Sequence, residues 1–267
     1  MTKVPIISLN GSSAGEAELP EQFNEACRPD LVRRAVHAEQ SRRFQPKGNY
    51  VYAGMENTAE YYGRRHGWRQ TINTGRSRLP REKLPGGRLG RVLRVPQAAK
   101  GRRAHPPKPW KRIIERINLK ERNFAIRSAI SATTNLQEVK KRGHEFEGSL
   151  PLVVENGLEQ ISKSKDALIA FEKLGLKKDL QRARDRRRMR SGRSRLRKGG
   201  YRSPKSVLVV IGEDKGIWKA ARNFPGVDVV KVNELSAETL APGGHLGRLT
   251  VWTSNAVSQL EKYSLFM

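Results

Sequence analysis

Arginine and glycine stand beside aromatic residues at two neighbouring places in the chain, residues 61–65 (YYGRR) and 67–69 (GWR). An aromatic ring can stack on an unpaired base, and a guanidinium group can bind a phosphate through two parallel hydrogen bonds. Glycine lets the backbone approach a ligand closely. The chemistry that these residues favour is therefore the binding of single-stranded or looped RNA, and not catalysis.

The positive charge of the chain is concentrated in two segments. Residues 41–111 contain 18 Lys and Arg against 3 acids, and residues 177–205 contain 14 against 2, giving net charges of +15 and +12. Together they account for the formal charge of +27, and the other 167 residues are neutral, with 21 bases and 21 acids. This concentration excludes an ordinary enzyme surface, on which the signs roughly cancel, and indicates a polyanionic partner.

Both segments favour arginine over lysine. They hold 23 Arg and 9 Lys, whereas the neutral remainder holds 10 Arg and 11 Lys. Lysine would suffice for solubility, while arginine is preferred where a planar fork must bind phosphate or stack on a base. We therefore expect the Arg and Lys side chains of both segments to neutralise phosphates.

Residues 42–111 show neither helical nor strand periodicity. The stretch 41–111 has 9 Gly, 7 Pro and only 9 Ile, Leu, Val or Met, too few for a core of its own. Loops of this length are either functional or disordered. Seven of the 17 aromatic residues of the chain lie here, although disordered linkers usually lack them. The composition favours an extended loop that becomes ordered on RNA over a free disordered linker.

Residues 176–190 permit a helix, but arginine would occupy every face of it. Like charges one turn apart destabilise a helix, which argues against a helix that is merely solvated. A membrane-surface helix needs an apolar stripe, and Leu180 and Met189 are nearly its only candidates. A nuclear-localisation cluster would leave the first segment unexplained. We interpret this segment as a second contact with nucleic acid.

The neutral remainder alternates Val-rich runs with amphipathic, helix-like stretches, and its strand-like runs are residues 4–9, 151–155, 206–212, 227–232 and 248–253. This alternation predicts an α/β fold: a mostly parallel sheet of about four strands with helices on both faces. Residues 1–41 and 112–267 would form the discontinuous globular domain. Residues 42–111 would be an extended basic loop inserted in it, and residues 177–205 an Arg-rich segment within it.

Signals for catalysis are weak. The strand ending at Gly212 and the helix after Gly216 resemble a nucleotide-binding turn, but the GxGxxG fingerprint is absent. The five His are scattered, and no Ser/His/Asp or paired-carboxylate arrangement is visible. Cys27 is the only cysteine, so we expect no disulfide and no cysteine-based zinc site, in agreement with a reducing compartment.

We therefore expect a chain that is not an enzyme. An RNA-modifying enzyme with a nucleotide-binding α/β domain is the alternative, and cofactor-dependent turnover on naked RNA would support it. A general nucleic-acid compaction protein is a third possibility, and it would bind DNA and RNA equally at raised salt. The longest aliphatic run, residues 207–211, is too short to span a bilayer, so no membrane partner is expected.

Four stretches of the chain carry a family resemblance. They are residues 240–253 (LAPGGHLGRLTVWT), residues 188–223 with RMRSG, SVLVVIGEDKGI and KAARN, residues 108–132 followed by PLVVE, and the loop with residues 75–81 (GRSRLPR) and 100–109. On these residues the chain resembles the L-four family of large-subunit ribosomal proteins in its archaeal and eukaryotic form. The lack of a long basic C-terminal tail resembles the archaeal type.

The resemblance implies a structural constituent of the large ribosomal subunit without catalytic activity. It implies an α/β domain on the subunit exterior, an early role in subunit assembly, contacts with several rRNA domains, and a loop tip that lines the polypeptide exit tunnel. The implied partners are large-subunit (23S-type) rRNA, neighbouring ribosomal proteins and the nascent polypeptide, in the cytoplasmic ribosome. We expect no homo-oligomer and no cofactor, with Mg ions bound only through rRNA.

The candidate site residues follow from the two basic segments and the family resemblance. The tunnel-tip candidates are Gly63, His66, Gly67 and Gly75. The candidate rRNA-binding residues are Arg64, Arg65, Trp68, Arg69, Arg76, Arg78, Arg81, Arg88, Arg91, Arg94, Lys100, Arg102, Arg103, His105, Lys108, Trp110, Lys111, Arg112, Arg186, Arg187, Arg188, Arg190, Arg193, Arg195, Arg197, Lys198 and Arg202.

Overall fold

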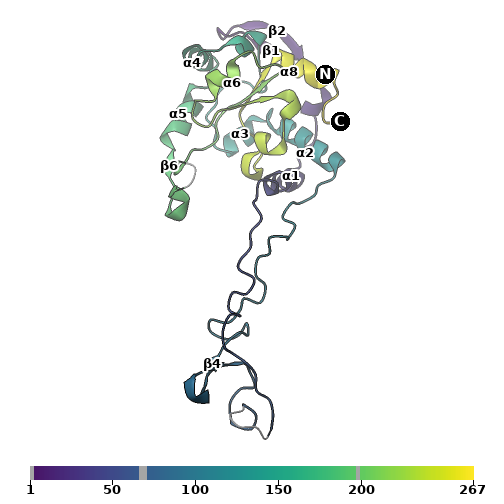
Figure 1. The fold of residues 1–267 in the computed structure, drawn as a ribbon. Coiled ribbons are helices and arrows are strands. Elements are labelled where there is room, and N and C mark those ends of the chain that lie inside the picture. Colours follow the sequence, from purple (N-terminus) through teal and green to yellow (C-terminus); the bar gives the residue numbers. More distant parts are fainter. Residues whose placement is uncertain (1–2, 66–70, 197–198) are drawn as a thin grey trace. The chain divides into compact units, whose positions relative to one another are not determined.

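The structure is a computed structural model that describes residues 3–65, 71–196 and 199–267. Its contacts separate the chain into two compact units (Figure 1). We call Met1–Arg43 together with Ile114–Met267 the α/β unit, and Phe44–Ile113 the inserted unit.

The α/β unit is built on a six-stranded sheet in the order β2-β1-β5-β10-β8-β9. β1 and β2 pair antiparallel, and all other neighbouring strands in this sheet are parallel. The strands are β1 (Lys3–Ile7), β2 (Ser13–Glu18), β5 (Leu152–Val154), β8 (Leu208–Ile211), β9 (Asp228–Lys231) and β10 (Thr250–Thr253).

The predicted α/β class with a mostly parallel sheet is confirmed, but the predicted number of about four strands is too low. The strand that the sequence pattern does not indicate is β2, which is almost wholly exposed and has no apolar alternation. β2 forms because a turn at residues 8–12, with Gly11 at φ +87°, returns the chain along β1. Backbone pairing at a sheet edge needs no buried side chains, so this strand leaves no hydrophobic signal.

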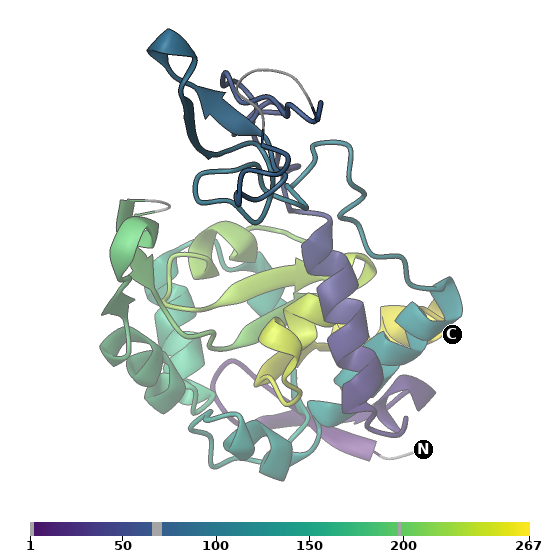
Figure 2. The ribbon, with the colours of Figure 1, turned by 90° about the horizontal axis from the view of Figure 1, so that it is seen from below.

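Helices lie on both faces of the sheet, as Figure 2 shows from below. α1, α2, α7 and α8 pack on one face, and α3, α4, α5 and α6 pack on the other. The helices are α1 (Pro29–Ser41), α2 (Leu119–Ala132), α3 (Leu136–Lys141), α4 (Ser164–Lys173), α5 (Lys177–Asp185), α6 (Ile217–Ala221), α7 (Ala237–Leu240) and α8 (Ser254–Lys262).

The sheet separates two hydrophobic cores, because side chains alternate along its buried strands. On β8, Leu208 and Val210 belong to one core, and Val209 and Ile211 belong to the other. Both faces of β8 are fully buried, which is the environment of a central parallel strand. The strand predicted at residues 206–212 is therefore present, and its continuous apolar run agrees with burial on both faces.

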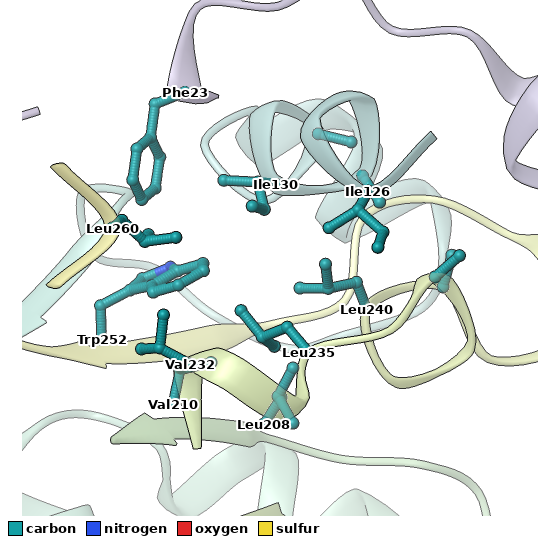
Figure 3. Packing of buried hydrophobic residues seen from close by; sticks show 14 of the residues in the cluster. Phe23, Ile126, Ile130, Leu208, Val210, Val232, Leu235, Leu240, Trp252 and Leu260 are labelled. Carbon is teal, nitrogen blue, oxygen red and sulfur yellow. The ribbon is translucent and has the colours of Figure 1, made fainter. Parts of the chain in front are cut away.

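Trp252 of β10 is the largest fully buried side chain of the core that contains Leu208 and Val210. Figure 3 shows its ring among Phe23, Leu260 and Val232. The Phe23 ring meets it edge-on, with the ring centroids 5.1 Å apart and the planes at 70°. Edge-to-face pairs of this kind stabilise a core beyond their buried area.

The inserted unit has a β-hairpin of β3 (Arg81–Lys83) and β4 (Leu89–Val92), and its described part contains no α-helix. The two arms that flank the hairpin pass close to each other, because a Cβ atom added at Gly48 would lie 2.8 Å from the ring of Pro109. The described residues of this unit bury very little, namely Ala59, Thr71 and Leu93. The unit therefore has almost no hydrophobic core, in keeping with its composition.

The second basic segment is shorter as a helix than its sequence permits. α5 ends at Asp185, whereas the helical pattern extends to residue 190. The chain then forms a small antiparallel hairpin of β6 (Arg188–Met189) and β7 (Tyr201–Arg202). Crowding of arginines at helical spacing disfavours continuation of the helix, and the hairpin separates them.

We expect the α/β unit to fold without most of the inserted unit. Replacing residues 60–95 with a short Gly-Ser linker removes no side chain of either core. Calorimetry of this variant should show one cooperative transition, within about 2 °C of that of the full chain. Trp252→Ala, as a positive control, should cost about 3–5 kcal/mol. Loss of the cooperative transition in the deletion variant would contradict the division into units.

Candidate nucleic-acid interface

The second basic segment is anchored through a buried carboxylate, Asp179 of α5. Its Oδ1 accepts hydrogen bonds from Arg182 Nε at 2.8 Å and from the backbone N–H of Glu145 at 3.2 Å. Its Oδ2 accepts one from Ser206 Oγ at 2.8 Å, and His144 Nδ1 lies 3.1 Å from Oδ1. α5 is thereby tied both to the loop after α3 and to the segment that enters β8.

Burial and hydrogen bonding together set the protonation states of Asp179 and His144. Burial alone would raise the pKa of Asp179, but hydrogen bonds from His144 and Arg182 outweigh it and lower the pKa to about 2. Burial, with smaller contributions from the positive charges of Arg182 and Arg142, lowers the pKa of His144. At pH 7 the ion pair is therefore Asp179 with Arg182, and His144 is neutral.

Not every cation of the segment is available to a ligand. The expectation that the Arg and Lys side chains of both segments neutralise phosphates is wrong for Arg182, which is 8% exposed and bound to Asp179. Lys205 also has a carboxylate partner, since its Nζ lies 2.7 Å from Asp228. These side chains hold the segment in place, and the outer arginines remain for binding.

The β6–β7 hairpin carries most of those outer arginines. Arg188 pairs with Arg202 across the hairpin, and the guanidinium carbon of Arg187 lies 4.3 Å from the ring centroid of Tyr201. The turn region includes Gly199 and Gly200, with φ of +72° and +73°, values that favour glycine. Two like charges directly opposite each other destabilise a hairpin, so a polyanion bound there would stabilise it.

The candidate residues of this segment are mostly exposed. Arg190 is partly buried, and Arg197 and Lys198 lie outside the described residues. Within the described part, Arg186 alone of the candidates here lies near an acid, 3.9 Å from Glu145. The exposed candidates are Arg186, Arg187, Arg188, Arg193, Arg195 and Arg202.

The inserted unit presents its cations in the same way. Arg81 and Arg94 are half-buried and donate to the backbone carbonyls of Gly90 and Met55, at 3.4 and 3.3 Å. Arg91 has an acidic neighbour, Glu82, at 3.8 Å. The remaining described candidates are exposed: Arg64, Arg65, Arg76, Arg78, Arg88, Lys100, Arg102, Arg103, His105, Lys108, Trp110, Lys111 and Arg112.

Aromatic rings accompany these cations in the inserted unit. Trp110 is 71% exposed, and Lys108 Nζ lies 5.6 Å from its ring centroid. Tyr50 and Tyr52 are also exposed and meet edge-on, with ring centroids 5.9 Å apart. A base can stack on an exposed ring of this kind. Trp68 and Arg69 lie outside the described residues.

The candidate tip residues divide between described and undescribed positions. His66 and Gly67 lie outside the described residues. Gly63 and Gly75 are exposed, and Gly75 has φ of +70° with open space around its Cα. Near them, the backbone N–H of Thr71 donates to the carbonyl of Tyr62 at 3.4 Å. Gly63 is next to one partner of this hydrogen bond, and Gly75 follows the other by four residues.

Comparison with known proteins identifies the family. A family model described as "Ribosomal protein L4/L1 family" matches residues 17–263. Large ribosomal subunit protein uL4 of Archaeoglobus fulgidus is 47% identical over 261 residues, covering 98% of this chain and 99% of that protein. The uL4 protein of Methanoculleus marisnigri is 46% identical over 262 residues, covering 98% and 100%. The chain belongs to the ribosomal protein L4/L1 family.

The predicted family is thereby confirmed, and both relatives are archaeal, as the chain's resemblance to the archaeal type indicated. The L4/L1 family consists of structural ribosomal proteins, so the prediction that the chain is not an enzyme is also confirmed. In the part of the chain that the structure describes, no cluster of side chains suits a metal ion. No helix in that part is long and apolar enough to cross a bilayer.

In this L4/L1 family member, the usual ligand position of an α/β sheet is taken by a side chain. Open α/β sheets bind ligands beyond the carboxyl ends of their strands. Here the buried Glu159 accepts hydrogen bonds at Oε1 from the Gly212 backbone N–H at 2.8 Å and from Thr253 Oγ1 at 2.7 Å. These donors follow β8 and end β10, and they would otherwise be available to a phosphate. Glu159 explains how the nucleotide-like turn exists without a nucleotide.

The spatial neighbours Ser206, His144 and Asp179 do not form a catalytic triad. Ser206 Oγ donates to Asp179, and His144 contacts the same carboxylate. A triad instead needs the histidine between the serine and the acid. Their shared hydrogen bonds to one carboxylate are structural.

Reasoning from sequence did not select Tyr201, which lies beside candidate arginines in the β6–β7 hairpin. The signal was present, because Tyr201 stands between Gly200 and Arg202 and repeats the glycine–aromatic–arginine pattern of residues 67–69. Its cation–π partner Arg187 lies fourteen positions earlier, and only the hairpin brings the two together. The pairing therefore could not be found from spacing along the chain.

Replacing Asp179 with Asn should destabilise the protein, because Arg182 would stay buried without its counter-charge. We expect the free energy of unfolding at pH 7 to fall by about 3–5 kcal/mol in urea denaturation. Asp185→Asn at the exposed end of α5 is the matched control, with a change within about 0.5 kcal/mol.

The pH dependence provides a second check. The pKa of Asp179 is lower in the folded chain than its ordinary value of 3.8, so its stabilising effect is complete above that pH and lost as pH falls towards 2. The stability difference between the wild type and Asp179→Asn should shrink across this range. A difference that stays constant there would show that the carboxylate charge is not responsible.

Proposed function

We propose that this chain is a structural protein of the large ribosomal subunit that binds its rRNA. The observation that carries the proposal is the set of exposed cations in two segments, most of which have no acidic partner within the described residues. Uncompensated charge of this density repels itself, and a polyanion removes that cost. Membership of the L4/L1 family and the names of the archaeal relatives support rRNA of the large subunit as that polyanion.

We further propose that the chain binds early in subunit assembly and contacts several rRNA domains. The inserted unit has almost no core, so its arrangement depends on what surrounds it, and counterion release can offset the cost of ordering it. A segment that RNA encloses is most easily placed before the RNA has folded around it. The two basic segments, far apart in sequence, offer separate contacts for separate parts of the RNA.

The inserted unit would carry the tunnel-lining tip, near Gly63 and Gly75. An arm of about 30 residues spans at most about 100 Å when fully extended, enough to reach an internal tunnel from the subunit exterior. The partners would then be large-subunit rRNA, neighbouring ribosomal proteins and the nascent polypeptide, in the cytoplasmic ribosome. The protein would need no cofactor of its own, and Mg ions would be held through rRNA.

Binding to transcribed large-subunit rRNA should weaken steeply with salt, because each neutralised phosphate contributes about 0.7–0.9 to the slope of log K against log salt. Changing Arg186, Arg187 and Arg188 together to Gln should lower that slope by about 2–3. The charge-matched control changes the exposed Lys163, Lys165 and Lys219 to Gln and should leave it unchanged. Equal affinity for DNA at raised salt would instead support a general compaction protein.

Photo-crosslinking in native ribosomes tests the tunnel proposal. A photo-reactive amino acid at Arg76, beside the candidate tip residue Gly75, should crosslink to rRNA and to a stalled nascent chain. The same amino acid at the exposed Glu16 of β2 is the control and should not reach the nascent chain. Crosslinks to rRNA alone from position 76 would leave rRNA binding intact and refute the tunnel assignment.

A further inference from the structure

A large basic cavity lies within the α/β unit, and residues of that unit line it. Its volume is about 920 Å³, and its walls come from α1, the end of α3, the segment after β7 and the loop at residues 242–246. Small-ligand sites typically have volumes of roughly 300–1,000 Å³, so the cavity could admit a whole nucleotide.

The charge of the cavity is only partly compensated. Six cations line it against one acid, Glu138. Three of the cations have carboxylate partners within 4 Å: Lys141 with Glu138, Arg182 with Asp179 and Lys205 with Asp228. The other three have none among the described residues, and they are Arg33, Arg142 and Arg202.

The glycine-rich loop from Pro242 to Leu246 forms one wall and holds Arg142. The guanidinium of Arg142 donates to the carbonyl of Pro242 at 2.9 Å and to the carbonyl of His245. Gly244, at φ +79°, allows Arg33 to approach, since a Cβ atom there would lie 2.9 Å from Arg33 Cγ. The loop therefore positions two arginines through backbone atoms, without supplying a negative charge.

The lowered pKa of Arg142 shows that its positive charge is poorly stabilised by its surroundings. Burial, together with the positive charges of Arg248 and Arg182, lowers the pKa of Arg142 to about 10. The side chain is still protonated at pH 7, so its charge persists in a partly desolvated place. An anion beside it would offset both contributions.

We infer that this cavity binds an RNA phosphodiester, with Arg33, Arg142 and Arg202 as the phosphate ligands; the inference rests on the proposed rRNA binding. Each guanidinium presents a planar fork of donors that matches the oxygens of a phosphate or a carboxylate, so the site suits an oxyanion. Arg202 belongs to the β6–β7 hairpin, so the cavity is continuous with the exposed arginines of the second basic segment. That continuity favours a nucleic-acid backbone over an isolated acidic peptide.

The first test uses the full chain and transcribed large-subunit rRNA. Arg33→Gln should reduce the slope of log K against log salt by about 0.7–0.9 and weaken binding roughly fivefold at 0.1 M salt. The side chain of Arg33 is exposed and makes no hydrogen bond or ion pair among the described residues, so this variant should fold normally. Arg222→Gln, an exposed arginine of the same unit outside the cavity, is the matched control and should change neither quantity.

Cys27 provides a second and independent readout, because the only cysteine of the chain is exposed and lines this cavity. Bound rRNA should slow alkylation of Cys27 by iodoacetamide at least severalfold. In the control, Cys27→Ser combined with Lys165→Cys places the thiol on α4, and rRNA should leave its alkylation rate unchanged. Arg142→Gln with unaltered thermal stability should lose the protection of Cys27.

The outcomes separate this inference from the proposed function. Steep salt dependence in the wild type, with no effect of Arg33→Gln and no protection of Cys27, would refute the cavity and leave rRNA binding in place. Loss of salt dependence in the wild type itself would refute the proposed function. AMP and inorganic phosphate are free ligands that could supply the same phosphate group to the cavity. Micromolar binding of either one that Arg33→Gln abolishes, without any change in rRNA affinity, would overturn the RNA assignment.

Discussion

The buried ion pair between Asp179 and Arg182 fixes the start of the segment that carries the outer arginines. Asp179 joins α5, the loop after α3 and the segment entering β8 through one carboxylate. Removing a partner from a buried pair is costly, because the remaining charge has no solvent to stabilise it. The hairpin that follows α5 therefore starts from a fixed point on a neutral fold. Without that point, the arginines of the segment would repel one another in an unconstrained chain.

Much of the α/β unit could be predicted from its sequence, because its strands obey simple rules. The run at residues 206–212 is apolar throughout, and it becomes a central strand buried on both faces. β2 could not be predicted, because its pairing is made by backbone atoms at an exposed edge. The end of α5 at Asp185 was missed for a different reason. The helix propensity of residues 176–190 does not include the repulsion between arginines on successive turns, which disfavours the helix beyond Asp185.

The interface was predictable as composition but not as geometry. Counts of arginine and lysine located both basic segments, aromatic residues marked the first of them, and most of the outer arginines are exposed. The same counts could not separate Arg182, which is internal, from Arg187, which is not. Nor could they find Arg33 and Arg142, which lie in neutral parts of the sequence and meet only because α1, α3 and the loop at residues 242–246 converge. Burial and convergence are properties of the fold, and spacing along the chain does not contain them.

The partner of each arginine separates its structural role from a binding role. Arg182 is buried against the carboxylate of Asp179, which cancels its charge, and Arg248 is buried against Asp228, a carboxylate that it shares with Lys205. Arg94 and Arg142 are instead held by backbone carbonyls, and Arg81 by a backbone carbonyl and the hydroxyl of Ser77.

A carbonyl fixes the direction of a guanidinium and leaves its full charge, whereas a carboxylate fixes the direction and removes the charge. An arginine that is partly buried yet bonded only to uncharged oxygens therefore keeps a charge that its hydrogen-bond partners do not neutralise. This distinction applies equally to the inserted unit and to the α/β unit. In the α/β unit, Glu159 takes the backbone and hydroxyl donors at the usual ligand position of the sheet, and the cations without a carboxylate partner lie elsewhere.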